Sequence, residues 1–124
     1  DNPDLHYKAL VDFDRDMIQL VNKGNVLRQI PRQLYVSDSQ KVLIFVRGRF
    51  IFALNFNPVH SYSDFEFVAP SGEYRIVLSS DAEVYDGFGR IDEGVHHRTL
   101  RKDGGDKLSL YLPSRSAIVL EKIR

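Results

Sequence analysis

Cysteine is absent from the 124 residues, and so is tryptophan, while methionine occurs once. Disulfides and thiolate metal sites are therefore excluded, and we expect a reducing compartment, the cytoplasm. The 17 basic residues balance the 17 acidic ones, so no positive excess indicates a nucleic-acid or anionic-membrane partner. No apolar run approaches the roughly 18 residues of a membrane span, and no signal peptide is visible.

The size and composition are those of one ordinary globular domain. A chain of 124 residues, 43% hydrophobic and 27% charged, has room for a stable core without disulfides. The sequence begins at Asp1 without an initiator Met. We expect it to be a piece of a longer protein, and such a piece need not contain the active site of its parent.

The first 30 residues show a helical pattern with two apolar stripes. Pro3 suits a first helical turn, Gly24 is a plausible end, and Pro31 prevents continuation. One stripe consists of Leu10, Phe13, Met17, Leu20 and Val21, and the other of Tyr7, Val11 and Ile18. A surface helix needs only one stripe, so we expect residues 1–30 to be covered on two sides.

From residue 33 onward the pattern is that of β-strands. The expected strands span residues 34–36, 42–46, 50–54, 65–68, 73–80, 107–112 and 117–121. Val42 to Val46 are apolar throughout, as in a strand covered on both faces, and Gly48 favours a tight hairpin. No helical pattern lies between these strands, so the sequence predicts an antiparallel β-sandwich or barrel.

A long polar interruption, residues 80–106, is predicted to be a loop. Glycosidic chemistry needs two carboxylates about 5–9 Å apart across the scissile bond. The loop contains Asp81, Glu83, Asp86, Asp92 and Glu93, but nothing in the sequence places two of them in a cleft. We interpret them as turn-forming, solvated residues and expect no catalytic residue in this chain.

Metal, nucleophile and phosphate motifs are missing as well. His96 and His97 are adjacent and would point to opposite faces of a strand, without the partners that zinc spacing requires. No serine lies in a G-x-S-x-G elbow, and Gly87 to Arg90 is too short for a phosphate-binding fingerprint. We therefore expect neither a metal nor a cofactor.

The aromatic residues divide into two groups. The first has the two-residue spacing of a sheet core and is predicted to pack there: Phe50, Phe52, Phe56, Phe65 and Phe67. The second, Tyr62, Tyr85 and Phe88, lies among Gly, Ser and Asp and provides candidates for rings that stack on sugars. Asn55, Pro58 and Asp64 are expected to shape turns rather than to handle protons.

Several short motifs follow one another in a distinctive order. They are L-x-Y-K-x-L-x-x-F-D-x-x-M at 5–17, N-F-x-P-x-x-S-Y-x-D at 55–64, R-I-V-L-S-S-D at 75–81, G-F-G-R-x-D at 87–92 and P-S-R at 113–115. Together they cover essentially the whole chain. In these motifs the sequence resembles the C-terminal end of 1,4-α-glucan branching enzymes, members of the α-amylase clan.

The resemblance implies a division of the chain. Residues 1–30 would be the last helical part of a (β/α)₈ catalytic barrel, and residues 31–124 the C-terminal β-sandwich of the α-amylase type. The parent enzyme would cut an α-1,4-linked glucan and rejoin it as an α-1,6 branch. Its catalytic residues would lie at the ends of barrel strands that precede this chain. The interface with the barrel would involve Tyr7, Val11, Ile18, Arg90 and Asp92.

Three functions stay open at this point. The chain is a non-catalytic domain that supports the barrel of a branching enzyme, a module that binds α-glucan by itself, or a structural domain of another α-amylase-clan hydrolase. Separation from a barrel would expose one apolar stripe. We therefore expect the isolated chain to associate with itself through residues 5–21, or this segment to be frayed.

Overall fold

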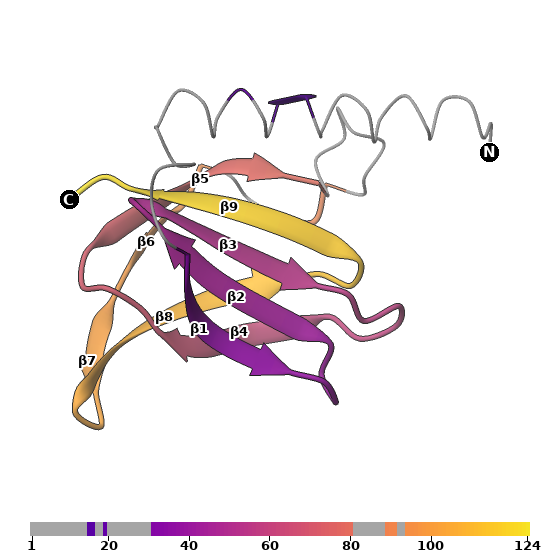
Figure 1. The fold of residues 1–124 in the computed structure, drawn as a ribbon, viewed down its shortest axis with the longest axis horizontal. Coiled ribbons are helices and arrows are strands. Elements are labelled where there is room, and N and C mark those ends of the chain that lie inside the picture. The colour runs from indigo at the N-terminus through magenta and orange to yellow at the C-terminus, as the bar shows by residue number, and fades with distance from the viewer. Residues whose placement is uncertain (1–14, 17–18, 20–30, 81–88, 92–93) are drawn as a thin grey trace.

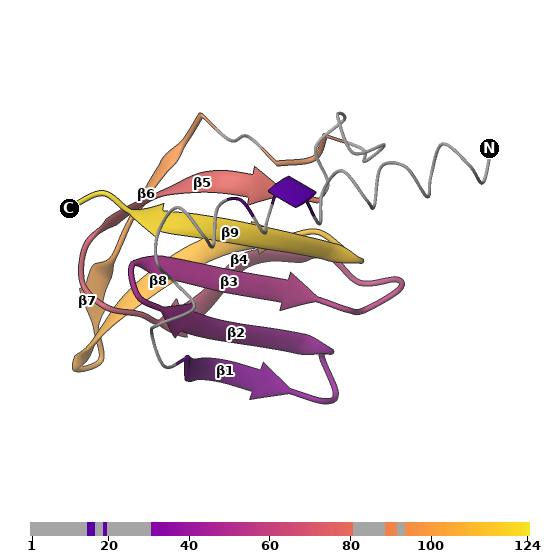
Figure 2. The same cartoon turned by 45° about the horizontal axis from the view of Figure 1, so that its top comes forward.

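The computed structural model describes residues 15, 16, 19, 31–80, 89–91 and 94–124. The described residues form nine strands in two antiparallel sheets (Figures 1 and 2). Six strands form one sheet in the order β1 (Arg32–Ser37), β2 (Val42–Arg47), β3 (Phe50–Asn55), β9 (Ser116–Lys122), β5 (Glu73–Ser79) and β6 (His96–Arg98). The other sheet has the order β4 (Tyr62–Val68), β8 (Gly105–Leu112) and β7 (Leu100–Lys102). The predicted antiparallel β-sandwich is confirmed.

The main core lies between the two sheets. Alternate residues of each strand point inward, so Ile44, Ile51 and Ile118 of the six-stranded sheet meet Phe65, Phe67, Leu108, Leu110 and Leu112 of the three-stranded sheet. Most of these side chains are almost completely buried. The packing of Phe65 and Phe67 was predicted from their spacing and is confirmed.

A second apolar cluster covers the outer face of the six-stranded sheet. It consists of Phe50, Phe52, Leu78 and Val119, all buried, and Phe45 stacks on Phe52 with ring centroids 4.8 Å apart. Both faces of the central strand β3 are therefore buried, which explains its uninterrupted apolar run. The predicted packing of Phe50 and Phe52 is confirmed, on this outer cluster rather than between the sheets.

Few residues of the predicted helical segment are described. Arg15, Asp16 and Gln19 have helical backbone conformation. The rest of the predicted helical segment, its two stripes and the boundary at residue 30 lie outside the described residues. In the described part of the chain, no helix has the length and hydropathy of a membrane span.

The prediction of one uninterrupted loop over residues 80–106 was wrong. β6 and β7 lie within it, and β8 begins at Gly105. Apart from the exposed Leu100, the residues of β6 and β7 are polar, and they show no apolar alternation. Backbone hydrogen bonds to β5 and β8 place these strands in the sheets.

A two-residue turn at Asp103-Gly104 joins β7 to β8, and its Asp-Gly signal is present in the sequence. Both residues have positive φ, 50° and 80°, as the two-residue turn of an Asp-Gly hairpin requires. The predicted hairpin at Gly48, whose φ is 61°, is confirmed.

Candidate functional site

Three loops meet at one end of the sandwich, on the right in Figure 1. They connect β1 to β2, β3 to β4 and β8 to β9, and backbone hydrogen bonds join them. The Phe56 N–H donates to the Lys41 carbonyl oxygen (2.8 Å), and the Arg115 N–H donates to the Asn57 carbonyl oxygen (3.1 Å). We call this region, residues 38–41, 55–62 and 112–116, the amide end.

Asn55 connects two of these loops from within the protein. Its side-chain amide donates to the carbonyl oxygens of His60 (3.1 Å) and Leu112 (3.0 Å), and its Oδ1 accepts from the Asn57 N–H (2.9 Å). Only 1% of Asn55 is exposed. Both of its amide hydrogens and its oxygen are thus engaged, as a buried amide requires.

Asn57 fixes the loop between β3 and β4 from the other side. Its Oδ1 accepts from the N–H groups of Val59 (3.0 Å) and His60 (2.8 Å), which is an Asx-type turn. Its Nδ2 donates to the Gln40 carbonyl oxygen (3.4 Å) and to the Tyr62 hydroxyl (3.3 Å). Asn57 was not singled out from the sequence. The signal that could have found it is the Asn-Pro pair, which favours turn initiation.

The tip of this loop exposes apolar side chains. Phe56 is 62% exposed and Val59 is 75% exposed, with the exposed Pro58 between them. The prediction that Phe56 packs in the sheet core was wrong, because β3 ends at Asn55 and the alternation of the strand ends with it. The expected role of Asn55 in shaping the strand end is confirmed by its hydrogen bonds.

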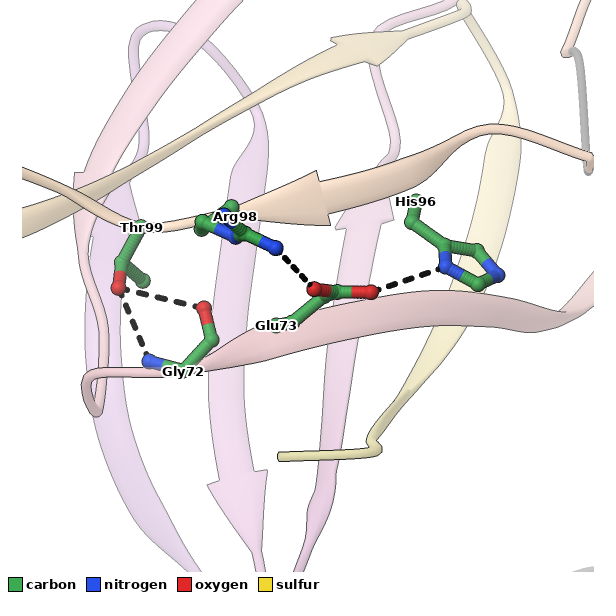
Figure 3. Close-up of polar contacts among 5 residues, drawn as sticks. All are labelled: Gly72, Glu73, His96, Arg98 and Thr99. Atoms are coloured by element: carbon green, nitrogen blue, oxygen red, sulfur yellow. Dashed lines mark hydrogen bonds and ion pairs between the residues drawn. The ribbon is translucent and has the colours of Figure 1, made fainter.

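The opposite end of the sandwich is held by charged groups around Glu73 (Figure 3). Arg98 donates to Glu73 Oε1 at 2.6 Å, and His96 Nδ1 lies 3.0 Å from Glu73 Oε2. Beside them, the Gly72 N–H donates to the Thr99 hydroxyl oxygen (2.9 Å), where the chain passes from β6 in one sheet to β7 in the other. We call Gly72, Glu73, His96, Arg98 and Thr99 the carboxylate end.

Electrostatics at this end favour an ionised carboxylate. The hydrogen bond from Arg98, and then that from His96, lowers the pKa of Glu73 from its ordinary value of 4.5. On the three-stranded sheet, the hydrogen bond from Lys102 likewise lowers the pKa of Glu66. A general acid for glycoside cleavage needs the opposite shift, so neither carboxyl group suits that role.

A small cavity lies beside β6 and β8. Its volume is about 250 Å³, and it is lined by Ile76, Arg90, Ile91, Val95, His97, Leu110 and Tyr111. His97 Nε2 is buried there and has no hydrogen-bond partner among the described residues, and burial lowers the pKa of the imidazole. Ligand pockets usually measure about 300–1,000 Å³, so this cavity is small for an oligosaccharide.

Within the described residues, no group of three or more His, Asp or Glu side chains could hold a metal ion.

Comparison with known families decides what this sandwich is. The model for the C-terminal all-β domain of α-amylase matches residues 35–123. The chain belongs to this family. A solved α-amylase from H. orenii has the same fold, with a TM-score of 0.52 at 16% identity over 91% of this chain and 20% of that one.

Curated relatives of this α-amylase C-terminal domain are branching enzymes. The 1,4-α-glucan-branching enzyme of Saccharomyces cerevisiae is 38% identical over 97% of the chain, and that of Equus caballus is 33% identical over 96%. In both comparisons the chain spans only 18% of the relative's length. The resemblance recognised in the sequence motifs is thereby confirmed.

The structure brings three motifs of the α-amylase C-terminal domain together at the amide end. Ser61, from the N-F-x-P-x-x-S-Y motif, accepts from the Ser114 N–H of the P-S-R motif (2.9 Å). Arg90, from the G-F-G-R motif, donates to the Ser114 carbonyl oxygen (3.1 Å). Sequence order separates these motifs, and only the fold shows that they belong to one region.

The predicted sugar-stacking and barrel-contact residues of the domain are only partly described. Tyr62 lies at the start of β4 and is half-buried, its ring packing on the core near Phe65, and its hydroxyl donates to the Gln40 carbonyl oxygen (3.0 Å). The others, apart from Arg90, lie outside the described residues: Tyr7, Val11, Ile18, Tyr85, Phe88 and Asp92. Their roles stay predictions.

Proposed function

We propose that this chain is the non-catalytic C-terminal domain of a 1,4-α-glucan-branching enzyme. Its task is to support the catalytic barrel of the same polypeptide. The parent enzyme breaks an α-1,4 bond in a glucan, holds the released segment, and joins that segment to a 6-hydroxyl as an α-1,6 branch. The barrel is the partner that this proposal requires.

One observation carries the proposal. Branching enzymes from yeast and horse match the chain over nearly its whole length, yet the match covers only 18% of each enzyme. The greater part of each relative, with ample room for a catalytic domain, therefore lies outside the matched region. A solitary sandwich with this sequence is best explained as one domain of such an enzyme.

The carboxyl groups of the described residues add support. Glu66, Glu73 and Glu121 each lie within ion-pair distance of basic side chains, and the pKa of each is lowered. An acid catalyst for glycosidic bonds instead needs a raised pKa and a second carboxylate nearby. These three groups serve as ion-pair partners in the folded domain.

The test compares three proteins on amylose: the full-length parent, the parent without residues 31–124, and the isolated chain. Iodine staining measures the loss of long linear chains, and a reducing-end assay runs in parallel. Branching lowers iodine staining without a net gain of reducing ends, because the cut segment is rejoined. We expect this result for the parent, none for the isolated chain, and a strong loss of activity or solubility for the truncated parent.

Each competing function gives its own signature in these assays. A steady gain of reducing ends by the parent would assign a hydrolase instead. A fall in iodine staining caused by the isolated chain would place catalytic groups within it. Either outcome would overturn the proposal.

A further inference from the structure

We propose that the tip formed by Phe56, Pro58 and Val59 is a docking surface for the remainder of the parent polypeptide. This inference rests on the function proposed above and adds a contact region to it. The partner is an apolar surface on the part of the enzyme that lies outside this chain.

Exposure of the tip is the first argument. Phe56 and Val59 are 62% and 75% exposed, although they lie only three residues apart with Pro58 between them. Single exposed apolar side chains are ordinary on protein surfaces. Three of them on one short loop form a local apolar projection, and such surfaces are typical of contact sites.

Rigidity of the loop is the second argument. The Val59 and His60 N–H groups are bonded to Asn57 Oδ1, the His60 carbonyl oxygen is bonded to Asn55, and the Phe56 N–H is bonded to Lys41. These bonds hold the loop in one conformation and prevent Phe56 and Val59 from folding back onto the core. A surface that is ordered beforehand loses less conformational entropy on docking.

The chemistry of the tip favours a protein partner over a sugar. A sugar site needs polar groups that are free to bond to hydroxyl groups. Here both amide groups of Asn55 and Asn57, and the hydroxyl of Tyr62, are engaged within the domain. Beside the exposed His60 and Ser61, the loop presents an aromatic ring and two aliphatic side chains, and these apolar groups suit an apolar protein surface.

The size of the parent makes this partner available. The chain spans 18% of the branching enzymes that it matches, so most of such a polypeptide lies outside it. A contact within one polypeptide also has a high effective concentration. A modest apolar contact of three side chains can therefore form between the two parts.

The experiment combines Phe56→Ser with Val59→Thr and places both changes in the isolated chain and in the full-length parent. The matched control is Val68→Thr, which removes the same methyl group from a 51% exposed valine on β4. Thermal unfolding is measured for all six proteins, and hydrogen exchange at residues 56–61 is measured for the two unsubstituted ones.

We expect the double variant to unfold about 2–4 °C lower than the unsubstituted protein in the parent. In the isolated chain its effect should stay below about 1 °C, because both side chains are already exposed there. The control should behave alike in both backgrounds. The Val59 and His60 amides should exchange roughly tenfold more slowly in the parent than in the isolated chain. If the double variant of the parent fails to accumulate while the double variant of the isolated chain folds, this result would also support docking of the tip.

Three outcomes would overturn the inference. One is an equal effect of the double variant in both backgrounds, with equal exchange at residues 56–61. Another is maltoheptaose binding by the isolated chain that the double variant abolishes, because the tip would then hold sugar. The third is a concentration-dependent dimer of the isolated chain that the double variant dissociates. None of these readouts uses branching activity, so they stay distinct from a failure of the proposed function.

Discussion

The two ends of the sandwich are fastened by different chemistry. At the amide end, neutral groups of Asn55 and Asn57, 1% and 7% exposed, bind backbone groups of three loops. At the carboxylate end, Glu73 binds two cationic or protonatable side chains that face solvent, His96 and Arg98. Buried neutral amides are insensitive to salt and to moderate pH, whereas exposed charges are screened and titrate.

The two ends therefore present different side chains at the protein surface. The amide network uses its polar groups internally, so the loop above it displays apolar side chains in a fixed arrangement. The carboxylate end leaves guanidinium and imidazole groups at the surface, and it holds the crossing between the sheets at Thr99. We therefore expect contact with the parent at the first end and a mainly structural role for the second.

The largest effect is expected for Asn55→Ala at the amide end. The substitution leaves the carbonyl oxygens of His60 and Leu112 and the Asn57 N–H without their partner. The free energy of unfolding should fall by about 2–4 kcal/mol, measured by urea denaturation. The exposed Gln33→Ala is the control and should change it by no more than about 0.5 kcal/mol. Equal effects of the two substitutions would show that the network does not hold the loops.

Gly72→Ala tests the packing at the carboxylate end. An added Cβ would lie 2.4 Å from the Arg124 carbonyl oxygen and 2.6 Å from Lys122 Cε, so the chain after β9 has to shift. We expect a loss of about 2 kcal/mol in the same urea experiment. Gly104→Ala provides the comparison, because φ there is +80° and no described atom lies within 4 Å of the added Cβ. Backbone strain alone should cost about 1 kcal/mol at that position, and a larger loss there than at Gly72 would contradict the steric argument.

Tyr62→Phe isolates one hydroxyl group of the amide end. The ring keeps its packing near Phe65, while the bonds to the Gln40 carbonyl oxygen and Asn57 Nδ2 are lost. The unfolding free energy should fall by about 1 kcal/mol. Maltoheptaose titration of Tyr62→Phe beside Tyr62→Ala also tests the sequence-based prediction of sugar stacking. Binding that survives in the first variant and disappears in the second would support stacking by the ring.

The smallest effect is expected from Glu73→Gln, and it disappears in acid. Arg98 and His96 lower the pKa of Glu73, so the stabilisation is present above about pH 4.5, the ordinary pKa, and is lost as the pH falls through the lowered value. The substituted chain should therefore lose less stability than the unsubstituted one between pH 6 and pH 3. Thermal unfolding at both pH values, with Asn55→Ala as the pH-insensitive comparison, measures the difference. If stability depends on pH in the same way in Glu73→Gln and in the unsubstituted chain, the Glu73 carboxylate does not cause the loss of stability in acid.

Prediction from the sequence succeeded where apolar side chains mark a core. The strands at 42–46 and 50–54 follow from short uninterrupted apolar runs, and the inward Phe65 and Phe67 follow from their two-residue spacing. It failed at β6 and β7, whose largely polar residues have no apolar alternation, and at Phe56, which continues the spacing of β3 beyond the end of the strand. Hydrogen bonds between backbone segments far apart in the sequence determine where these strands form and end. A local pattern of apolar residues does not indicate such bonds.

The sequence by itself determined the class of the domain, its family and the absence of thiol chemistry, because composition, alternation and short motifs are local properties. Only the tertiary structure decided that Ser61, Arg90 and Ser114 meet at one end of the sandwich. It also decided that Asn55 and Asn57 hold the loop between β3 and β4 in place and that Phe56 on this loop is exposed to solvent. The reason is physical: a buried amide acts through the backbone groups that surround it, and those groups come from strands far apart along the chain.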